Sequence, residues 1–484
     1  MSKKLNNNEL KHIGFRHEDL LAQTGYICKN LIKEGIFEKE TLLNLLGQLL
    51  ENPEHFAEHP QLNSIAQLAM QLQPRPKVLQ APTEHFELRN QITAFNTYGK
   101  DYIDQQAIEQ MNVAMRLPVS IAGALMPDAH VGYGLPIGGV LATPPNVVIP
   151  YAVGVDIACR MCLSVFDIEA HVVESKSLML KNYLLDNTVF GIDGRFAKPL
   201  PCEVFDRPEW NATEVIRKLR HKAQLQIGTS GTGNHFVEWG ILEVMQPDSA
   251  LRLPTGKYLA LLSHSGSRGF GAAIANHYSK IATERTKLPK EARHLAWLNL
   301  DTAEGQEYWI AMNLAGHYAA ANHHQIHQRM AKALGTKPLL MVENHHNFAW
   351  LEQLPDGSDV MVHRKGATPA HANQLGIIPA TMTQAGFVVR GKGNPQALNS
   401  ASHGAGRLMA RGQALRSITK AEWKKVLKEK NVTLIGADLD EAPMVYKDLN
   451  KVMEFQEDLV EVLAKFQPKI VRMADPDKRN RRED

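Results

Sequence analysis

MPDAHVGYGLPIGGVLATPPNVVIPYAVGVDIACRM, residues 126–161, is the stretch around which the chain is organised. Asp128, His130, Asp156 and Cys159 lie in it among glycines, with almost no other charged side chains. Candidate ligands are therefore carried on backbone that can turn sharply. Asp156 and Cys159 directly follow the apolar run 147–155, so we expect a carboxylate and a thiolate together at the end of a buried strand. Such a pair suits a borderline cation such as Mn²⁺ or Zn²⁺.

The composition is typical of a soluble globular protein: of 484 residues, 44% are hydrophobic and 22% charged. No apolar run reaches the length of a membrane span, and the first residues lack the apolar segment of a secretory signal, so we expect a cytoplasmic protein without membrane association. Four cysteines do not make a disulfide framework in a chain of this length, and 21 histidines favour metal chemistry. A net charge of +3 does not by itself indicate nucleic-acid binding.

The chain divides into regions that differ in composition and in hydrophobic periodicity. Apolar residues recur at helical spacing up to about residue 72, and a linker, QPRPKVLQAPTEH (73–85), follows. Short apolar runs and glycine-containing loops come next, with one long helical region expected over 286–334, which indicates an α+β fold. We expect a helical extension over 1–80, a large domain over 81–474, and a charged, disordered tail over 475–484.

Five further motifs combine glycine with histidine or basic residues. They are GTSGTGNHFVEW (228–239), SHSGSRG (263–269), ENHHNF (343–348), HRKGAT (363–368) and SASHGAGRLMAR (400–411). Any one histidine is more often structural than a ligand, and we interpret Cys28, Cys162 and Cys202 as packing residues. The joint occurrence of these motifs with the Asp-x-x-Cys pair nevertheless indicates a site that holds a metal and a phosphate.

These motifs resemble the RtcB RNA ligases over about residues 95–471. The resemblance is carried by MPDAHVGYGLPIGGV, PYAVGVDIACRM, GTGNHF, SHSGSRG, HHNF, HRKGATPA, SASHGAGR and DLDEAPMVYKD, in the family's order. It implies one large α+β catalytic domain with a mixed β-sheet core. It also implies an enzyme that uses GTP and two Mn²⁺ ions to join RNA ends with a 3′-phosphate or 2′,3′-cyclic phosphate to 5′-hydroxyl ends. A histidine is guanylylated first, GMP passes to the RNA 3′-phosphate, and the 5′-hydroxyl then displaces GMP.

The resemblance also assigns roles to residues. Cys159 is expected to bridge the two Mn²⁺ ions, with His264 and His346 at one and Asp156 and His235 at the other. His403 is the expected nucleophile, with Asp128 beside it. Arg407 and Arg411 are expected to clamp the reacting phosphate, and Arg268 and Lys365 to bind RNA phosphate. The expected nucleotide contacts are Asn234, Glu238, Asn347, Gly404, Ala405, Gly406, Tyr446 and Arg472.

Three departures from the family pattern stand out. Ala158 and Arg160 flank Cys159 where the pattern Asp-Ile-Gly-Cys-Gly-Met has glycines, so we expect a tighter loop and a cation near the metal site. Arg472 stands near the place of a C-terminal Lys-Gly whose lysine contacts guanine. The helical extension has no counterpart in compact members.

The leading hypothesis is a GTP- and Mn²⁺-dependent RNA ligase of tRNA splicing or RNA repair, acting as a monomer or weak homodimer. Whether it needs an archease-like activator stays open. One alternative is a guanylyltransferase that caps or processes damaged ends without efficient sealing. Another is an RNA-binding relic, which the joint presence of all the expected ligands and the nucleophile disfavours.

Overall fold

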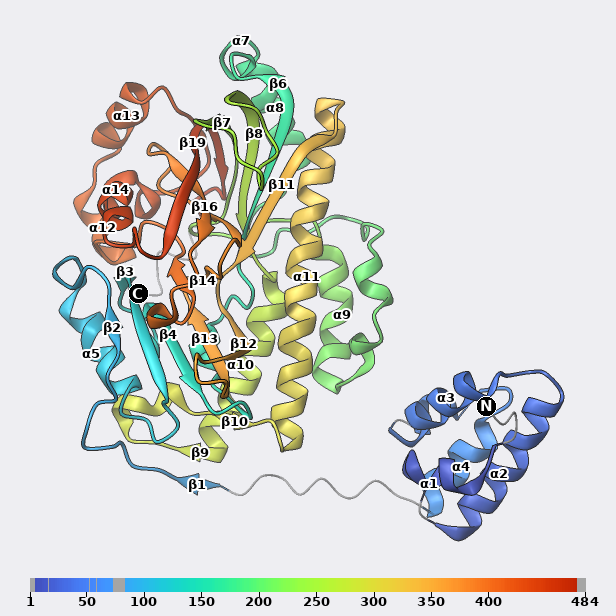
Figure 1. The fold of residues 1–484 in the computed structure, drawn as a ribbon. Helices are drawn as coiled ribbons and strands as arrows, with labels where there is room; N and C mark the ends of the chain where they lie inside the picture. The colour runs from blue at the N-terminus through green and yellow to red at the C-terminus, as the bar shows by residue number, and fades with distance from the viewer. Residues whose placement is uncertain (1–4, 16, 52, 58, 73–82, 477–484) are drawn as a thin grey trace. The chain divides into compact units, whose positions relative to one another are not determined.

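Two units make up the chain, residues 1–79 and 80–484, in a computed structural model that describes residues 5–15, 17–51, 53–57, 59–72 and 83–476. Figure 1 shows the course of the chain in each unit. Most of the expected linker and of the expected charged tail, residues 73–82 and 477–484, lies outside the described residues. No described helix is both long and apolar enough to span a membrane.

Helices form the first unit: α1 (Asn7–His12), α2 (Glu18–Lys33), α3 (Lys39–Glu51) and α4 (Asn63–Leu72). Asn6 and Glu9 make a reciprocal capping box at the start of α1. In α3, Leu42, Leu46 and Leu49 follow helical spacing and are fully buried. The helical periodicity expected here is therefore confirmed.

An eight-stranded sheet forms one half of the second unit, with strand order β11-β6-β8-β7-β19-β16-β15 and β18 paired to β19. Its pairs are antiparallel except for β18 with β19, so the sheet is mixed. Its strands are β6 (Arg160–Glu169), β7 (Phe236–Val244), β8 (Gly256–Ser265), β11 (Pro338–His345), β15 (Leu375–Ile378), β16 (Gly386–Gly391), β18 (Thr433–Ile435) and β19 (Val460–Met473).

A five-stranded sheet with the order β12-β13-β4-β3-β2 forms the other half. Its strands are β2 (Asn96–Thr97), β3 (Ala122–His130), β4 (Ile137–Thr143), β12 (Phe348–Gln353) and β13 (Asp359–Lys365). Three short pairs add to the two sheets: β1 (Glu84–His85) with β9 (Thr286–Lys287), β5 (Val147–Val148) with β10 (Leu298–Asn299), and β14 (Ala367–Pro369) with β17 (Ser400–Ser402). The expected α+β fold with a mixed sheet is confirmed.

The long helix α11 (Ala303–Leu334) runs beside β6 and β8 and packs against α10 (Arg268–Arg285) (Figure 1). The expected helix over 286–334 is wrong in its first part, where β9 and a 3₁₀ turn precede α11. Pro289 interrupts that segment, and the Thr302 side chain caps the new helix by accepting from Gly305 N.

The remaining helices are α5 (Gln105–Ala114), α6 (Pro150–Val153), α7 (Val172–Ser175), α8 (Ser177–Asn187), α9 (Glu214–Gln226), α12 (Arg411–Ser417), α13 (Lys420–Glu429) and α14 (Leu449–Glu454).

Candidate functional site

A cavity of about 1060 Å³ is lined by residues of both sheets. Pockets for small molecules commonly measure about 300–1,000 Å³, so this one has room for more than a single small ligand. Most of the residues singled out from the sequence line it: Asp156, Cys159, Asn234, His235, Glu238, His264, His346, Asn347, Lys365, His403, Gly404, Ala405, Gly406, Arg407, Arg411 and Tyr446.

Asp156 and Cys159 lie in the loop between α6 and β6, at the beginning of a strand and not at the end of one. The apolar run 147–155 does not continue as a strand because Pro150 begins the short helix α6. Backbone bonds join the loop to the turn after β11, where His346 N donates to Cys159 O at 2.9 Å. Ala158 has a φ of 55°, a left-handed conformation that costs a residue with a side chain about 1 kcal/mol relative to glycine.

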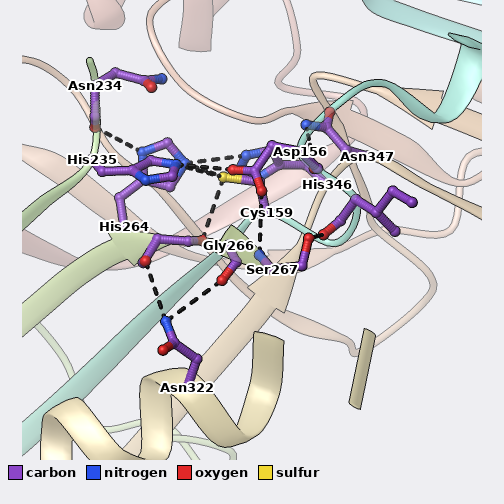
Figure 2. Close-up of polar contacts among 12 residues, drawn as sticks. Asp156, Cys159, Asn234, His235, His264, Gly266, Ser267, Asn322, His346 and Asn347 are labelled. Carbon is purple, nitrogen blue, oxygen red and sulfur yellow. Dashed lines mark hydrogen bonds and ion pairs between the residues drawn. The ribbon is translucent and has the colours of Figure 1, made fainter. Parts of the chain in front are cut away.

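Side chains from separate strands and loops meet at the Cys159 thiol (Figure 2). His264 Nε2 lies 3.1 Å from Cys159 Sγ and 3.2 Å from His346 Nε2. His235 Nε2 lies 3.5 Å from the same sulfur and 2.9 Å from Asp156 Oδ2. Nitrogen, sulfur and oxygen atoms thus converge on one small volume.

Burial favours the neutral form of two imidazoles in the cluster, which is the form that binds metal. Burial lowers the pKa of His264 to about 3 and that of His346 well below its usual value, so both imidazoles are neutral. Burial opposes ionisation of Asp156, but the hydrogen bond and charge of His235 together lower the pKa of its carboxyl. Burial raises the pKa of the Cys159 thiol, and a bound cation would stabilise the thiolate instead.

Two overlapping groups share the thiol: Cys159 with His264 and His346, and Cys159 with Asp156 and His235. Within each group the candidate ligand atoms lie within 4.8 Å of one another. Imidazole, thiolate and carboxylate together suit Mn²⁺ or Zn²⁺. The residues therefore fit a pair of divalent cations that share one sulfur ligand.

His403 follows β17 and borders this cluster, with its ring centroid 4.8 Å from that of His346. Asp128, fully buried at the end of β3, binds it through one oxygen: Oδ2 accepts from His403 Nδ1 at 2.7 Å and from the backbone N–H groups of His403 and Gly404. A β-carbon at Gly406 would lie 2.0 Å from Asp128 O, so only glycine fits this turn. The contact fixes the imidazole with Nδ1 toward Asp128.

A buried carboxylate, Glu238 on β7, faces the cavity farther from the thiol. It is 4% exposed and has no hydrogen-bond or ion-pair partner among the described residues. Burial raises its pKa well above the ordinary value, because no partner among the described residues compensates the carboxylate charge. An unpaired buried carboxyl group in a cavity wall calls for a ligand with N–H groups.

Glu441 organises the arginines of the site, although we had not singled it out from the sequence. Its carboxylate accepts hydrogen bonds from Arg411 and from the Tyr446 hydroxyl, and Arg407 Nη1 lies 3.6 Å away. The guanidinium of Arg407 also stacks over the Tyr446 ring. Glu441 belongs to the motif DLDEAPMVYKD, but the motif alone does not predict which of its acidic side chains points into the cavity.

Lys365 and Asn347 close the side of the cavity formed by β13 and the turn before β12. Lys365 is 7% exposed, and burial lowers its pKa to about 7. Its ammonium donates to the carbonyl of Tyr133. Asn347 donates to Asp156 O at 3.2 Å and accepts from Gly366 N at 2.8 Å. It therefore links the loop that carries Asp156 and Cys159 to the turn that follows Lys365.

Two arginines that we expected to contact ligand do not line the cavity. Arg472 is absent from the described residues that line the cavity, because Val471 and Met473 take the inward positions of β19 and alternation turns Arg472 the other way. It donates to Leu184 O at 2.8 Å. Arg268 is likewise absent from the described lining and braces the glycine-rich loop through Thr229 Oγ1 at 3.0 Å and Gly191 O at 2.6 Å.

Arg160 also lies differently from the expectation of a cation beside the metal ligands. Its guanidinium reaches across to β11, with Nη1 3.5 Å from Glu343 Oε2 and Nη2 3.2 Å from His345 Nδ1. It is not among the described residues lining the cavity. Its charge is therefore directed toward Glu343.

The chain is similar to known proteins over most of its length. The profile of the family described as tRNA-splicing ligase RtcB matches residues 110–207 and 202–474. RNA-splicing ligase RtcB of Escherichia coli (strain K12) is 31% identical over 373 residues, covering 70% of this chain and 87% of that protein. The RNA-splicing ligase RtcB of Mycobacterium tuberculosis is 30% identical, over 72% of this chain and 95% of its own. The tRNA-splicing ligase RtcB of Thermococcus kodakarensis is 28% identical, over 74% and 90%.

Proposed function

Since the chain belongs to the RtcB family and is an RNA ligase, we propose that it seals RNA 3′-phosphate or 2′,3′-cyclic phosphate ends to 5′-hydroxyl ends, using GTP, Mn²⁺ and a guanylylated histidine. The observation that carries the proposal is the pairing of His403 with Asp128 beside the Cys159 cluster. A nucleophile candidate and a set of ligands for two cations thus open into one cavity.

Asp128 prepares His403 to attack. A carboxylate oxygen only accepts hydrogen bonds, so the 2.7 Å contact places the imidazole proton on Nδ1 and leaves the Nε2 lone pair free. In the proposed first step, Nε2 bonds to the α-phosphorus of GTP and pyrophosphate leaves. Asp128 then stabilises the positive charge that the ring acquires.

The Cys159 cluster is the proposed metal site. Asp156 and His235 would hold one Mn²⁺, His264 and His346 the other, and Cys159 would bind both. Bound there, the ions would neutralise phosphate charge and make phosphorus more electrophilic. The protein's own contribution is a fixed, buried arrangement of neutral imidazoles that needs little reorganisation when the substrate binds.

Glu238 is the proposed guanine reader. Guanine presents two N–H donors on its pairing edge, and these would favour the ionised carboxylate that burial alone disfavours. Adenine offers no such pair, so the buried carboxylate would lack its partner. Tyr446 and Asn234 also line the cavity and are proposed nucleotide contacts, and Lys365, Arg407 and Arg411 are proposed phosphate contacts.

The test is incubation of the pure protein with α-labelled GTP and Mn²⁺, followed by a nicked RNA with 3′-phosphate and 5′-hydroxyl ends. We expect a labelled protein adduct, then labelled RNA, then sealed product. Label that reaches the RNA without sealing would instead support end capping. Absence of any adduct in a protein that seals the RNA would overturn the histidine intermediate. The tRNA or repair substrate, and any activator, are to be sought with the same assay.

A further inference from the structure

A second cysteine and histidine cluster lies at the interface between the eight-stranded sheet and α11. Cys162 is on β6, and His323 and His327 are one turn apart on α11. Their candidate ligand atoms lie within 4.8 Å of one another, and none of the three residues is more than 1% exposed. None of them lines the large cavity, so the cluster is separate from the proposed reaction site.

Hydroxyl groups orient both imidazoles. His323 Nδ1 lies 2.7 Å from Ser263 Oγ, and His327 Nδ1 lies 2.7 Å from Ser164 Oγ. This is the arrangement expected for metal-bound histidines, in which one ring nitrogen binds an oxygen partner and the other faces the ion. Ser263 Oγ also lies 2.8 Å from His327 Nε2. The hydroxyl proton of Ser263 would turn away from this nitrogen when a cation binds there.

His323 Nε2 is a fully buried nitrogen without a hydrogen-bond partner among the described residues. Such groups are rare because burying a polar atom without a hydrogen bond is unfavourable. Burial lowers the pKa of His323 well below its usual value and that of His327 to about 3, so both rings are neutral. Two neutral imidazoles facing a thiol have the chemistry of a soft ligand set.

We propose that Cys162, His323 and His327 supply three ligands to a Zn²⁺ ion separate from the Cys159 cluster. Thiolate and imidazole without a carboxylate favour zinc over manganese. Bonds of about 2.0 Å to nitrogen and 2.3 Å to sulfur place tetrahedral ligands roughly 3.5 Å apart, so the side chains would have to move closer together on binding the ion. The cluster residues are buried and line neither the large cavity nor the smaller one beside α5, so we expect the ion to enter during folding.

Such an ion would fasten α11 to the strands that carry the reaction site. Cys162 lies three residues after Cys159. Opposite it on β8 is Ser263, the residue that precedes His264. Bonds from the ion to α11 and β6 would therefore help to fix the positions of Cys159 and His264 relative to each other.

The test uses the full-length Cys159→Ala protein, grown in minimal medium with Co²⁺ in place of Zn²⁺, because that variant lacks the thiolate of the first cluster. We expect a thiolate-to-cobalt charge-transfer band and the strong visible bands of tetrahedral cobalt. Zinc-grown protein should retain zinc through dialysis against a chelator.

Matched double variants decide the assignment. Cys159→Ala/Cys162→Ala should lose the band, and Cys159→Ala/Cys202→Ala should keep it. If the first of these does not fold, Cys159→Ala/His323→Gln provides a second test, since it keeps the thiol and loses the free imidazole nitrogen. Absence of the band in folded Cys159→Ala, or its persistence in either the Cys162 or the His323 double variant, overturns the proposal.

Discussion

The two units of this chain differ in what they bury. Among the described side chains of residues 1–79, Thr24 is the only buried polar one, and the core consists of leucine, isoleucine, phenylalanine, alanine and Cys28. The second unit buries histidines, arginines, lysines, glutamates and an aspartate. Buried polar groups stabilise a fold only when paired, so the second unit carries groups whose presence folding alone does not explain. The predictions below test whether that polar interior serves chemistry.

Cys159→Ala gives the largest expected effect. Removing the shared thiolate leaves two cations with fewer ligands and with less charge between them. We expect the GMP adduct to be abolished and bound Mn²⁺ to fall, as measured by labelling and by elemental analysis. Cys28→Ala, which alters an equally buried cysteine of the first unit, should leave both unchanged. A Cys159→Ala protein that keeps both Mn²⁺ equivalents and its adduct rules out the bridging role.

His403→Ala should separate metal binding from nucleophilic attack. His403 belongs to neither cation group, so metal content should persist while the adduct and ligation from GTP disappear. RNA already ending in a 3′-diphosphoguanosine bypasses the adduct and should still be sealed at a reduced rate. His221→Ala, at an exposed histidine, is the control. A GMP adduct on the His403→Ala protein would assign the nucleophile to another residue.

Glu441→Gln tests what the buried carboxylate of Glu441 contributes to stability. The carboxylate is 4% exposed and pairs with Arg411, Tyr446 and Arg407. Its neutralisation should lower the free energy of unfolding by about 1–2 kcal/mol, less than for a fully broken buried ion pair, because Arg411 is partly exposed and keeps its ion pair with Asp440. Urea unfolding measures this, with the exposed Glu454→Gln expected within about 0.5 kcal/mol of the parent protein. Equal stabilities of the two variants would show that the arginines need no internal counter-charge.

Lys365→Met should change how stability depends on pH. Burial lowers the pKa of Lys365 from its ordinary 10.5 to about 7. Between those values the unfolded chain binds more protons at this residue than the folded chain does, so the parent protein should gain stability relative to the variant as pH rises. The slope should approach about 1.4 kcal/mol per pH unit. Denaturant unfolding at pH 7, 8 and 9 measures it; a parallel dependence for the parent and variant contradicts the buried neutral amine.

Removal of residues 1–79 should have the smallest effect on chemistry. The first unit contributes no residue to the described lining of the cavity, so a protein beginning at Gln80 should form the GMP adduct at an unchanged rate. Labelled GTP measures this. A folded, truncated protein that fails to form the adduct would show that the first unit supports the site.

Sequence motifs predict which residue types the site contains, but they do not predict which side of a strand or helix a given side chain occupies. Asp156, Cys159, His235, His264 and His346 were grouped by their motifs, and the structure brings them together. Arg472 and Arg268 do not line the cavity, because a basic residue in a recognised segment can point to either side of its element. On β19 the strand register decides the side, and that register is set by pairing with β7, more than 200 residues away.

The pairing of Arg160 with Glu343 makes these two positions depend on each other. Arg160 is 8% exposed on its side chain and Glu343 is 34% exposed. Glutamate at 343 tolerates a small neighbour because water and His324 still reach it, whereas arginine at 160 without that acid would be a buried charge facing a neutral imidazole. Loss of Glu343 is therefore expected to cost stability while Arg160 is present, and exchange of Arg160 for a small residue is expected to remove most of that cost.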